Sequence, residues 1–173
     1  LKVMVGAWLS DKKALNEEEI TNLIKVAKAG NADMVAVGNE VLYREELTEE
    51  ELLVYIHRVK KELPNIEVGY VDAYYEFTNR PAITEACDVI FANCYPFWEG
   101  CHIDYSLLYM KNMYYKALEA AKGKKVIISE TGWPNRGSAF EASEPSVENA
   151  LKYFINTQKW SLEENIEVMY FSS

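Results

Sequence analysis

The sequence predicts an α/β fold in which strands and helices alternate around a parallel sheet, as in a partial (β/α)8 TIM barrel. Short apolar runs alternate along the chain with longer amphipathic segments that carry helix-capping residues. The short runs are almost continuously apolar, which is typical of parallel strands covered on both faces. A complete eight-unit barrel needs about 250 residues, whereas this chain has 173. We therefore expect an incomplete barrel of about six strands and five helices.

Six runs are expected to be strands because they are rich in Val, Ile, Tyr and Phe. They are Val3–Trp8, Met34–Gly38, Ile66–Val71, Val89–Tyr95, Val126–Ser129 and Ile166–Phe171. Consecutive strands are expected to be parallel with right-handed crossovers, in a sheet that is either open or closed as a barrel. No G-x-G-x-x-G or G-x-x-x-x-G-K segment follows a strand, so the nucleotide-binding versions of such sheets lack their fingerprint.

Five helices are expected between these strands. Two of them begin with a polar residue that precedes a Glu by three positions, Asn16 with Glu19 and Thr48 with Glu51. Gly30 and Pro64 predict where these two helices end. The other three are expected over residues 80–86, 106–121 and 146–160, the first of them short.

Composition and charge exclude several classes of function. The chain has 18 Lys and Arg against 27 Asp and Glu, a net charge of −9, so a nucleic-acid or anionic-membrane surface is not expected. No run approaches the roughly 18 apolar residues of a membrane span. Cys87, Cys94 and Cys101 are spaced seven residues apart, which is not a zinc-binding spacing, so we expect free, partly buried thiols.

Two glutamates are placed where the chemistry of such sheets gathers, just beyond the carboxyl ends of the strands. Glu40 follows the second predicted strand and Glu130 follows the fifth. Either one alone is equally well explained as a solvated carboxylate or an ion-pair partner. Together at one mouth they favour glycoside hydrolysis, in which one carboxylic acid assists the leaving oxygen while an ionised carboxylate attacks the anomeric carbon.

Three segments resemble the motifs of family 17 glycoside hydrolases, which are retaining (β/α)8 enzymes that act on β-1,3-glucans. They are Val126-Ile127-Ile128-Ser129-Glu130-Thr131-Gly132-Trp133-Pro134-Asn135-Arg136-Gly137, Val37-Gly38-Asn39-Glu40-Val41 and Asn93-Cys94-Tyr95-Pro96-Phe97. The first is long and specific, and the Asn-Glu pair of the second is shared with the wider clan. The resemblance covers practically the whole chain. It implies that the chain corresponds to barrel strands 3 to 8, without the first two β/α units, so that residues 1–173 form a single incomplete catalytic domain.

The resemblance also implies roles for individual residues. Glu40 would be the general acid/base and Glu130 the nucleophile, with Asn39 bonding the 2-hydroxyl of the sugar. Tyr95 would keep Glu130 ionised and oriented, although a core tyrosine beneath the site is an equally good interpretation. Phe97, Trp98 and Trp133 would line the sugar cleft, although the position of Trp98 further into a loop also favours a purely structural interpretation. No cofactor or metal is expected.

The resemblance leaves several functions open. The first is a β-1,3-glucan hydrolase whose truncated chain is active or inactive, and the second is a transglycosylase with the same covalent intermediate. The third is a non-catalytic glucan-binding module, and the fourth is a partial-barrel scaffold that self-associates as a homo-oligomer through its exposed strand edges. The expected partner is a β-glucan oligosaccharide or polysaccharide, without nucleic acid or membrane insertion. Because polymeric glucan lies outside most cytoplasms, an extracellular or secreted location is expected.

Overall fold

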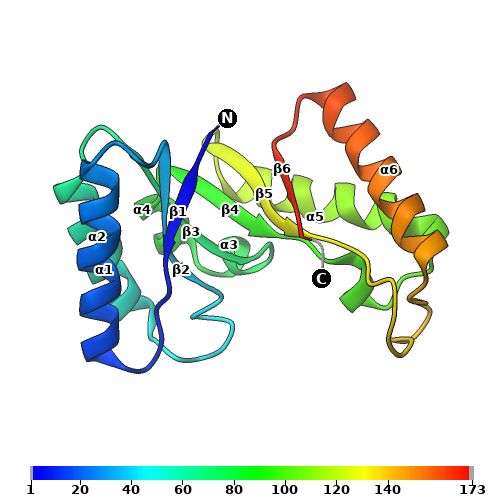
Figure 1. The fold of residues 1–173 in the computed structure, drawn as a ribbon, viewed down its shortest axis with the longest axis horizontal. Coiled ribbons are helices and arrows are strands. Elements are labelled where there is room, and N and C mark those ends of the chain that lie inside the picture. The colour runs from blue at the N-terminus through cyan, green and yellow to red at the C-terminus, as the bar shows by residue number, and fades with distance from the viewer. Residues whose placement is uncertain (1, 172–173) are drawn as a thin grey trace.

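The structure, a computed structural model, describes residues 2–171 and contains one six-stranded parallel sheet. The strands pair in chain order, so each strand lies beside the strand that precedes it in the sequence (Figure 1). The strands are β1 (Met4–Ala7), β2 (Met34–Asn39), β3 (Glu67–Ala73), β4 (Val89–Asn93), β5 (Lys125–Thr131) and β6 (Val168–Tyr170). The predicted partial barrel is confirmed, with β1 and β6 as its outer strands.

The helices of the described residues form the crossovers between the strands. They are α1 (Lys13–Lys28), α2 (Glu49–Glu62), α3 (Glu76–Asn79), α4 (Pro81–Ala86), α5 (Ser106–Ala120) and α6 (Val147–Glu164). All five predicted helices form, and α3 adds one turn ahead of the predicted short helix. Two 3-10 turns, Pro96–Glu99 and Ile103–Tyr105, lie between β4 and α5.

Capping residues explain where two helices begin and why one prediction was wrong. Thr48 and Glu51 form the predicted capping box of α2, and the Ser146 hydroxyl accepts a hydrogen bond from the Asn149 amide at the start of α6. Asn16, in contrast, is not a cap, because α1 already begins at Lys13. Its buried side chain instead bonds both the amide and the carbonyl of Ser10, which fixes the loop before α1.

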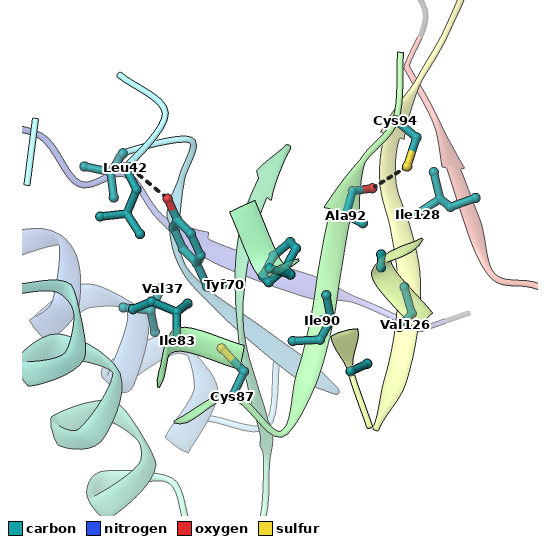
Figure 2. Packing of buried hydrophobic residues seen from close by; sticks show 14 of the residues in the cluster. Val37, Leu42, Tyr70, Ile83, Cys87, Ile90, Ala92, Cys94, Val126 and Ile128 are labelled. Carbon is teal, nitrogen blue, oxygen red and sulfur yellow. Dashed lines mark hydrogen bonds between the residues drawn. The ribbon is translucent and has the colours of Figure 1, made fainter. Parts of the chain in front are cut away.

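Apolar side chains cover both faces of the sheet, as the continuous apolar runs predict. One cluster lies between the strands and the helices; Figure 2 shows Val37, Tyr70, Ile90 and Ile128, which belong to it and come from four different strands. A smaller cluster lies on the inner face, and it consists of Met34, Ala36, Val71, Val89, Phe91 and Ile127. Successive residues of β2 alternate between the two clusters, which is the period-two pattern of a strand.

Extra residues interrupt this alternation at the carboxyl ends of β2 and β5. Between Ala36 and Asn39, β2 advances three residues while β3 advances two. Between Ile128 and Thr131, β5 advances three residues while β6 advances two, and β5 also gains one residue against β4. An extra residue in one strand changes the face to which the following side chains point. These two interruptions determine which side chains reach the mouth of the sheet.

Two remaining sequence predictions concern the cysteines and the membrane. Cys87, Cys94 and Cys101 are all free and buried, which confirms the prediction of free thiols. In the part of the chain that the structure describes, every helix is too short or too polar to cross a lipid bilayer.

Candidate active site

Two glutamates from strands that are three apart in the sheet line one cavity at its carboxyl end. Glu40 directly follows β2, and Glu130 is the second-last residue of β5. The cavity has a volume of about 430 Å³, and both glutamates line it. The structure therefore brings together the two acidic residues on which the sequence prediction depends.

A continuous chain of hydrogen bonds joins these two carboxyl groups. The Asn93 amide nitrogen donates to Oε1 of Glu40 at 2.9 Å and to the Asn39 amide oxygen at 3.3 Å. The Asn39 amide nitrogen in turn donates to Oε1 of Glu130 at 3.0 Å. The Ser129 hydroxyl donates to the Asn93 amide oxygen at 2.7 Å, which fixes the orientation of that amide. Asn93 is buried, so this orientation is supported on every side by protein.

Tyr95 completes the surroundings of Glu130. Its hydroxyl donates to Oε2 of Glu130 at 2.8 Å, while Asn39 occupies Oε1. Burial and the neighbouring carboxylate both raise the pKa of Tyr95, so its hydroxyl stays protonated and acts as a donor. Both oxygens of Glu130 thus accept hydrogen bonds, which fix the orientation of its carboxyl group. The described contacts of Glu40 include a single side-chain donor, Asn93.

The extra residues in β2 and β5 are what aim Asn39 and Glu130 at each other. Strict alternation would place Asn39 on the same face as Val37, and Glu130 on the same face as Ile128, both toward the helices. Instead, Asn39 and Glu130 line a hollow of the inner face with Ala36. Glu40 itself has a φ of +53°, a left-handed backbone conformation that L-residues adopt only where the surrounding structure enforces it.

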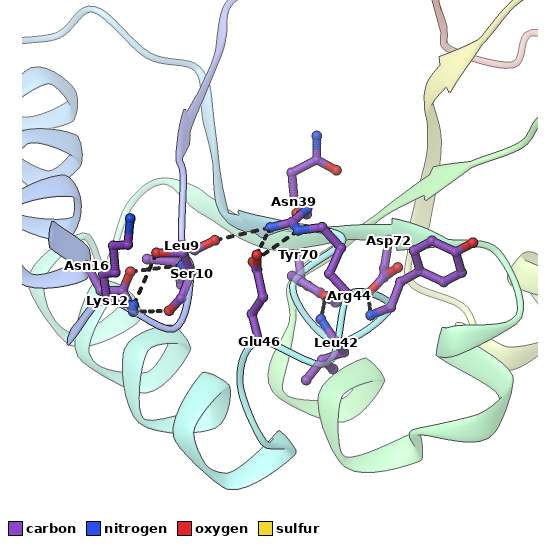
Figure 3. Close-up of polar contacts among 11 residues, drawn as sticks. Leu9, Ser10, Lys12, Asn16, Asn39, Leu42, Arg44, Glu46, Tyr70 and Asp72 are labelled. Carbon is purple, nitrogen blue, oxygen red and sulfur yellow. Dashed lines mark hydrogen bonds and ion pairs between the residues drawn. The ribbon is translucent and has the colours of Figure 1, made fainter.

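Arg44 holds the backbone that carries Asn39. Its guanidinium donates to the Asn39 carbonyl at 2.6 Å and to the Leu9 carbonyl at 3.2 Å, and it pairs with Glu46 at 2.7 Å (Figure 3). The same group lies 4.7 Å from the centre of the Trp8 ring. Arg44 therefore ties the end of β2 to the segment after β1, using the planar fork that a lysine lacks.

A buried Tyr70–Asp72 pair holds the turn that follows Glu40. The Tyr70 hydroxyl accepts from the Leu42 amide at 2.9 Å and donates to the Asp72 carboxylate (Figure 3). Asp72 also accepts from the amides of Ala73 at 2.7 Å and Tyr43 at 3.4 Å. Burial raises the pKa of Asp72 to about 6, although these donors act in the opposite direction.

The predicted aromatic residues divide into exposed and buried ones. Trp98 is 63% exposed and lines the central cavity. Phe97 and Trp133 are only 2% and 5% exposed, and their rings pack edge to face with centres 5.2 Å apart. With Trp98 and Tyr95 they border a smaller adjoining hollow of about 170 Å³.

Sequence reasoning missed several residues of the cavity. Asn93 lies near the end of the predicted strand Val89–Tyr95 and begins one of the family-like motifs, so its position carried a signal that was not used. The walls also include Tyr43, Tyr74, Tyr75 and Glu99. Tyr74 and Tyr75 follow β3 directly, at the same edge of the sheet as the glutamates. This position was the signal that could have identified them.

Comparisons with known proteins find relatives among glycoside hydrolases. The model of the BtgE/BtgC glycoside hydrolase domain matches residues 1–173. A glucan 1,3-beta-glucosidase of Candida albicans is 31% identical over 171 residues, covering 86% of this chain and 55% of that protein. A glucan 1,3-beta-glucosidase of Saccharomyces cerevisiae is 30% identical over 174 residues, covering 88% of this chain and 55% of that protein. The chain thus spans about half the length of these curated relatives.

Solved structures give the same result. A family 17 beta-1,3-glucanosyltransferase from Rhizomucor miehei superposes with a TM-score of 0.92 at 32% identity, over 100% of this chain and 66% of that one. An endo-laminarinase from Formosa superposes with a TM-score of 0.84 at 16% identity, which shows a shared fold alone. The predicted resemblance to family 17 glycoside hydrolases is confirmed.

Proposed function

Because the chain belongs to the BtgE/BtgC glycoside hydrolase domain family, we propose that it acts on β-1,3-glucan as a retaining glycoside hydrolase. The chain spans only about half the length of its curated relatives. Activity of residues 1–173 as one incomplete-barrel domain is therefore part of the proposal. The names of those relatives and the two carboxyl groups in one cavity support the substrate class and the reaction class.

The observation that carries the assignment of roles is the unequal hydrogen bonding of the two glutamates. Glu130 accepts from Asn39 and Tyr95, one donor for each oxygen, which supports a nucleophile held in a fixed orientation. Glu40 accepts from Asn93 through Oε1 and also lines the cavity, which supports a carboxyl group that exchanges a proton with bound sugar or water.

The reaction then takes two steps. In the first, Glu130 attacks the anomeric carbon while Glu40 gives its proton to the glycosidic oxygen, so the carbon–oxygen bond breaks and a glycosyl ester forms on Glu130. In the second, Glu40 takes a proton from water, and the water oxygen displaces Glu130 from the sugar. Asn39 is placed to bond the 2-hydroxyl of that sugar, a contact that strengthens as positive charge develops on the ring.

Transglycosylation is the second candidate reaction. It uses the same glycosyl ester, but a sugar hydroxyl replaces water in the second step. The similarity to a structure named as a beta-1,3-glucanosyltransferase favours it specifically. Because polymeric glucan lies outside most cytoplasms, an extracellular location follows from either reaction and is part of this proposal.

Incubation of the chain with β-1,3-linked glucose oligosaccharides of two to seven units tests the proposal. We expect shorter products, with longer ones as well if transglycosylation competes. The Glu40→Gln and Glu130→Gln variants keep the side-chain shape and are expected to give none. Binding of the oligosaccharides without any product from the parent chain would contradict catalysis and favour a non-catalytic binding module.

A further inference from the structure

A second hollow lies beside the central cavity, and neither the proposed reaction nor the sequence motifs account for it. One wall is formed by the segment from the end of β3 through α3, with Tyr74, Tyr75, Thr78 and Asn79. The opposite wall is formed by the second half of α5, with Lys116 and Glu119. Its volume is about 460 Å³, slightly more than that of the central cavity.

The hollow exists because the crossover between β3 and β4 is short. Its helices α3 and α4 have four and six residues, whereas α1, α2, α5 and α6 have between 14 and 18. Although α3 contacts α5 (Figure 1), so short a crossover leaves part of the neighbouring face of α5 uncovered. The groove is therefore a consequence of chain length at this crossover.

The two hollows adjoin each other at a pair of tyrosines. Tyr74 and Tyr75 line both of them, with ring centres 5.3 Å apart and planes at 81°. On the central side, the Tyr74 hydroxyl contacts Oε1 of Glu99 at 3.5 Å. On the outer side, the Lys116 ammonium group lies 5.8 Å from the centre of the Tyr74 ring. The tyrosine pair thus forms a ridge with one hollow on each side.

The chemistry of the second hollow fits a neutral polyhydroxylated ligand. Aromatic rings supply apolar faces, and the exposed side chains of Thr78, Asn79, Lys116 and Glu119 supply both donors and acceptors. The hollow contains charges of both signs, and the whole chain carries a net charge of −9, which disfavours an anionic polymer. These groups lie next to the central cavity, because Tyr74 and Tyr75 line both hollows.

We propose that the second hollow binds the continuation of a β-1,3-glucan chain whose reacting linkage lies between Glu40 and Glu130, with Tyr74 and Tyr75 as the ridge between the two parts. This inference rests on the proposed function. It assigns to Asn79 and Lys116 a role in selecting long chains over short ones, without any role in the chemical steps.

The test measures binding of β-1,3-linked glucose oligosaccharides of two to seven units by titration calorimetry, using the full chain with Glu130→Gln to prevent turnover. We expect the longest oligosaccharides to bind about tenfold more tightly than the shortest, which corresponds to two or so additional hydrogen bonds. Adding Asn79→Ala and Lys116→Ala together should remove this gain and leave the affinity for the two-unit sugar unchanged. Both residues are exposed, so the substitutions leave the core intact.

A matched control and a blocking variant complete the experiment. Lys159→Ala removes an exposed lysine from α6 and should change no affinity. Thr78→Trp, which places a large side chain in the hollow, should abolish the gain with length. Equal affinity for all lengths in the parent, or equal weakening of short and long sugars by the double variant, would overturn this inference alone. Failure of every length to bind would overturn the proposed function together with it.

Discussion

The Asn39 amide nitrogen donates to Oε1 of Glu130 at 3.0 Å, although the two residues are separated by 91 positions in the sequence. The contact depends on an extra residue in each of the two strands that carry them, β2 and β5. Each extra residue turns its side chain from the helix-covered face to the inner face of the sheet. The residue that precedes one candidate carboxyl group therefore helps to orient the other, and the two halves of the site are built as one unit.

Replacing Tyr95 by Phe is expected to slow turnover without preventing sugar binding. The substitution removes the hydroxyl that donates to Oε2 of Glu130 at 2.8 Å, and the ring remains. A hydrogen bond to a charged group contributes about 1.5–3 kcal/mol, so kcat should fall roughly 10- to 150-fold while KM changes little. Steady-state kinetics on a β-1,3-linked oligosaccharide measures both constants. An unchanged kcat would show that Tyr95 is only a packing residue.

The raised pKa of Asp72 leads us to expect that the stability of the fold depends on pH. Its pKa is about 6 in the folded chain against 3.8 for an ordinary carboxyl, so between these values the folded state binds more protons than the unfolded state. The contribution of Asp72 to the free energy of unfolding therefore falls as pH rises from about 4 to 6, by up to about 3 kcal/mol.

The Asp72→Asn variant isolates this contribution, because asparagine does not titrate. The free energy of unfolding is measured in urea for parent and variant at pH 4, 5, 6 and 7. The difference between the two proteins is then taken at each pH. We expect the parent to lose stability relative to the variant as pH rises through this range. A difference that stays constant from pH 4 to 7 would show that Asp72 keeps the same charge in both states.

Gly69 is expected to tolerate no side chain. A Cβ atom at this position would lie 2.4 Å from the Val89 carbonyl oxygen and 2.5 Å from the Phe91 ring. Because the nearest atom belongs to the backbone of the neighbouring strand, Gly69→Ala should destabilise the fold by about 3 kcal/mol, at the upper end of overpacking effects. Gly6→Ala is the matched control, since its Cβ would have no contact closer than 3.9 Å. Equal urea midpoints for the two variants would refute this explanation.

Self-association through the outer strands remains a prediction. β1 and β6 each have one neighbour in the sheet of the described residues, and neither contains a proline that would blunt its free edge. We expect sedimentation at low micromolar concentration to detect species heavier than the 19.9 kDa chain. A single species of that mass, with β1 and β6 amides that exchange as slowly as those of β3, would contradict the prediction.

The sequence was sufficient to predict the architecture and to place both glutamates at one edge of the sheet. The strands are long apolar runs, so periodicity located them, and both glutamates follow such runs directly. Thr48 and Ser146 predicted helix starts correctly because a cap acts over three residues. Asn16 was misleading because its side chain bonds the preceding loop, a long-range choice that local spacing does not reveal.

The finer structure of the site depends on relations between strands, which one sequence does not display. The extra residues in β2 and β5 are visible only when each strand is compared with its neighbours. The Tyr70–Asp72 pair lies within a run that reads as an ordinary buried strand. The burial of Phe97 and Trp133, predicted as cleft residues, follows from their packing against each other. These features arise from tertiary context, so composition and spacing carry no record of them.

We propose that Glu130 attacks the sugar and that Glu40 exchanges the proton, and azide distinguishes these roles by the configuration of its product. The substrate is an aryl β-glycoside of a β-1,3-linked glucose disaccharide, whose leaving group needs no acid. In Glu130→Ala, azide enters the space of the carboxylate and attacks the face opposite the leaving group, which gives an α-glycosyl azide. In Glu40→Ala, the ester on Glu130 still forms, and azide then displaces Glu130 to give a β-glycosyl azide.

The deciding measurement is the anomeric configuration of these products by NMR, with the parent chain assayed on the same substrate. We predict the α-azide from Glu130→Ala and the β-azide from Glu40→Ala. The opposite pairing would reverse the two roles. An active parent whose variants both fail to form any azide product, or a parent that does not cleave the substrate, would contradict a retaining mechanism through Glu40 and Glu130.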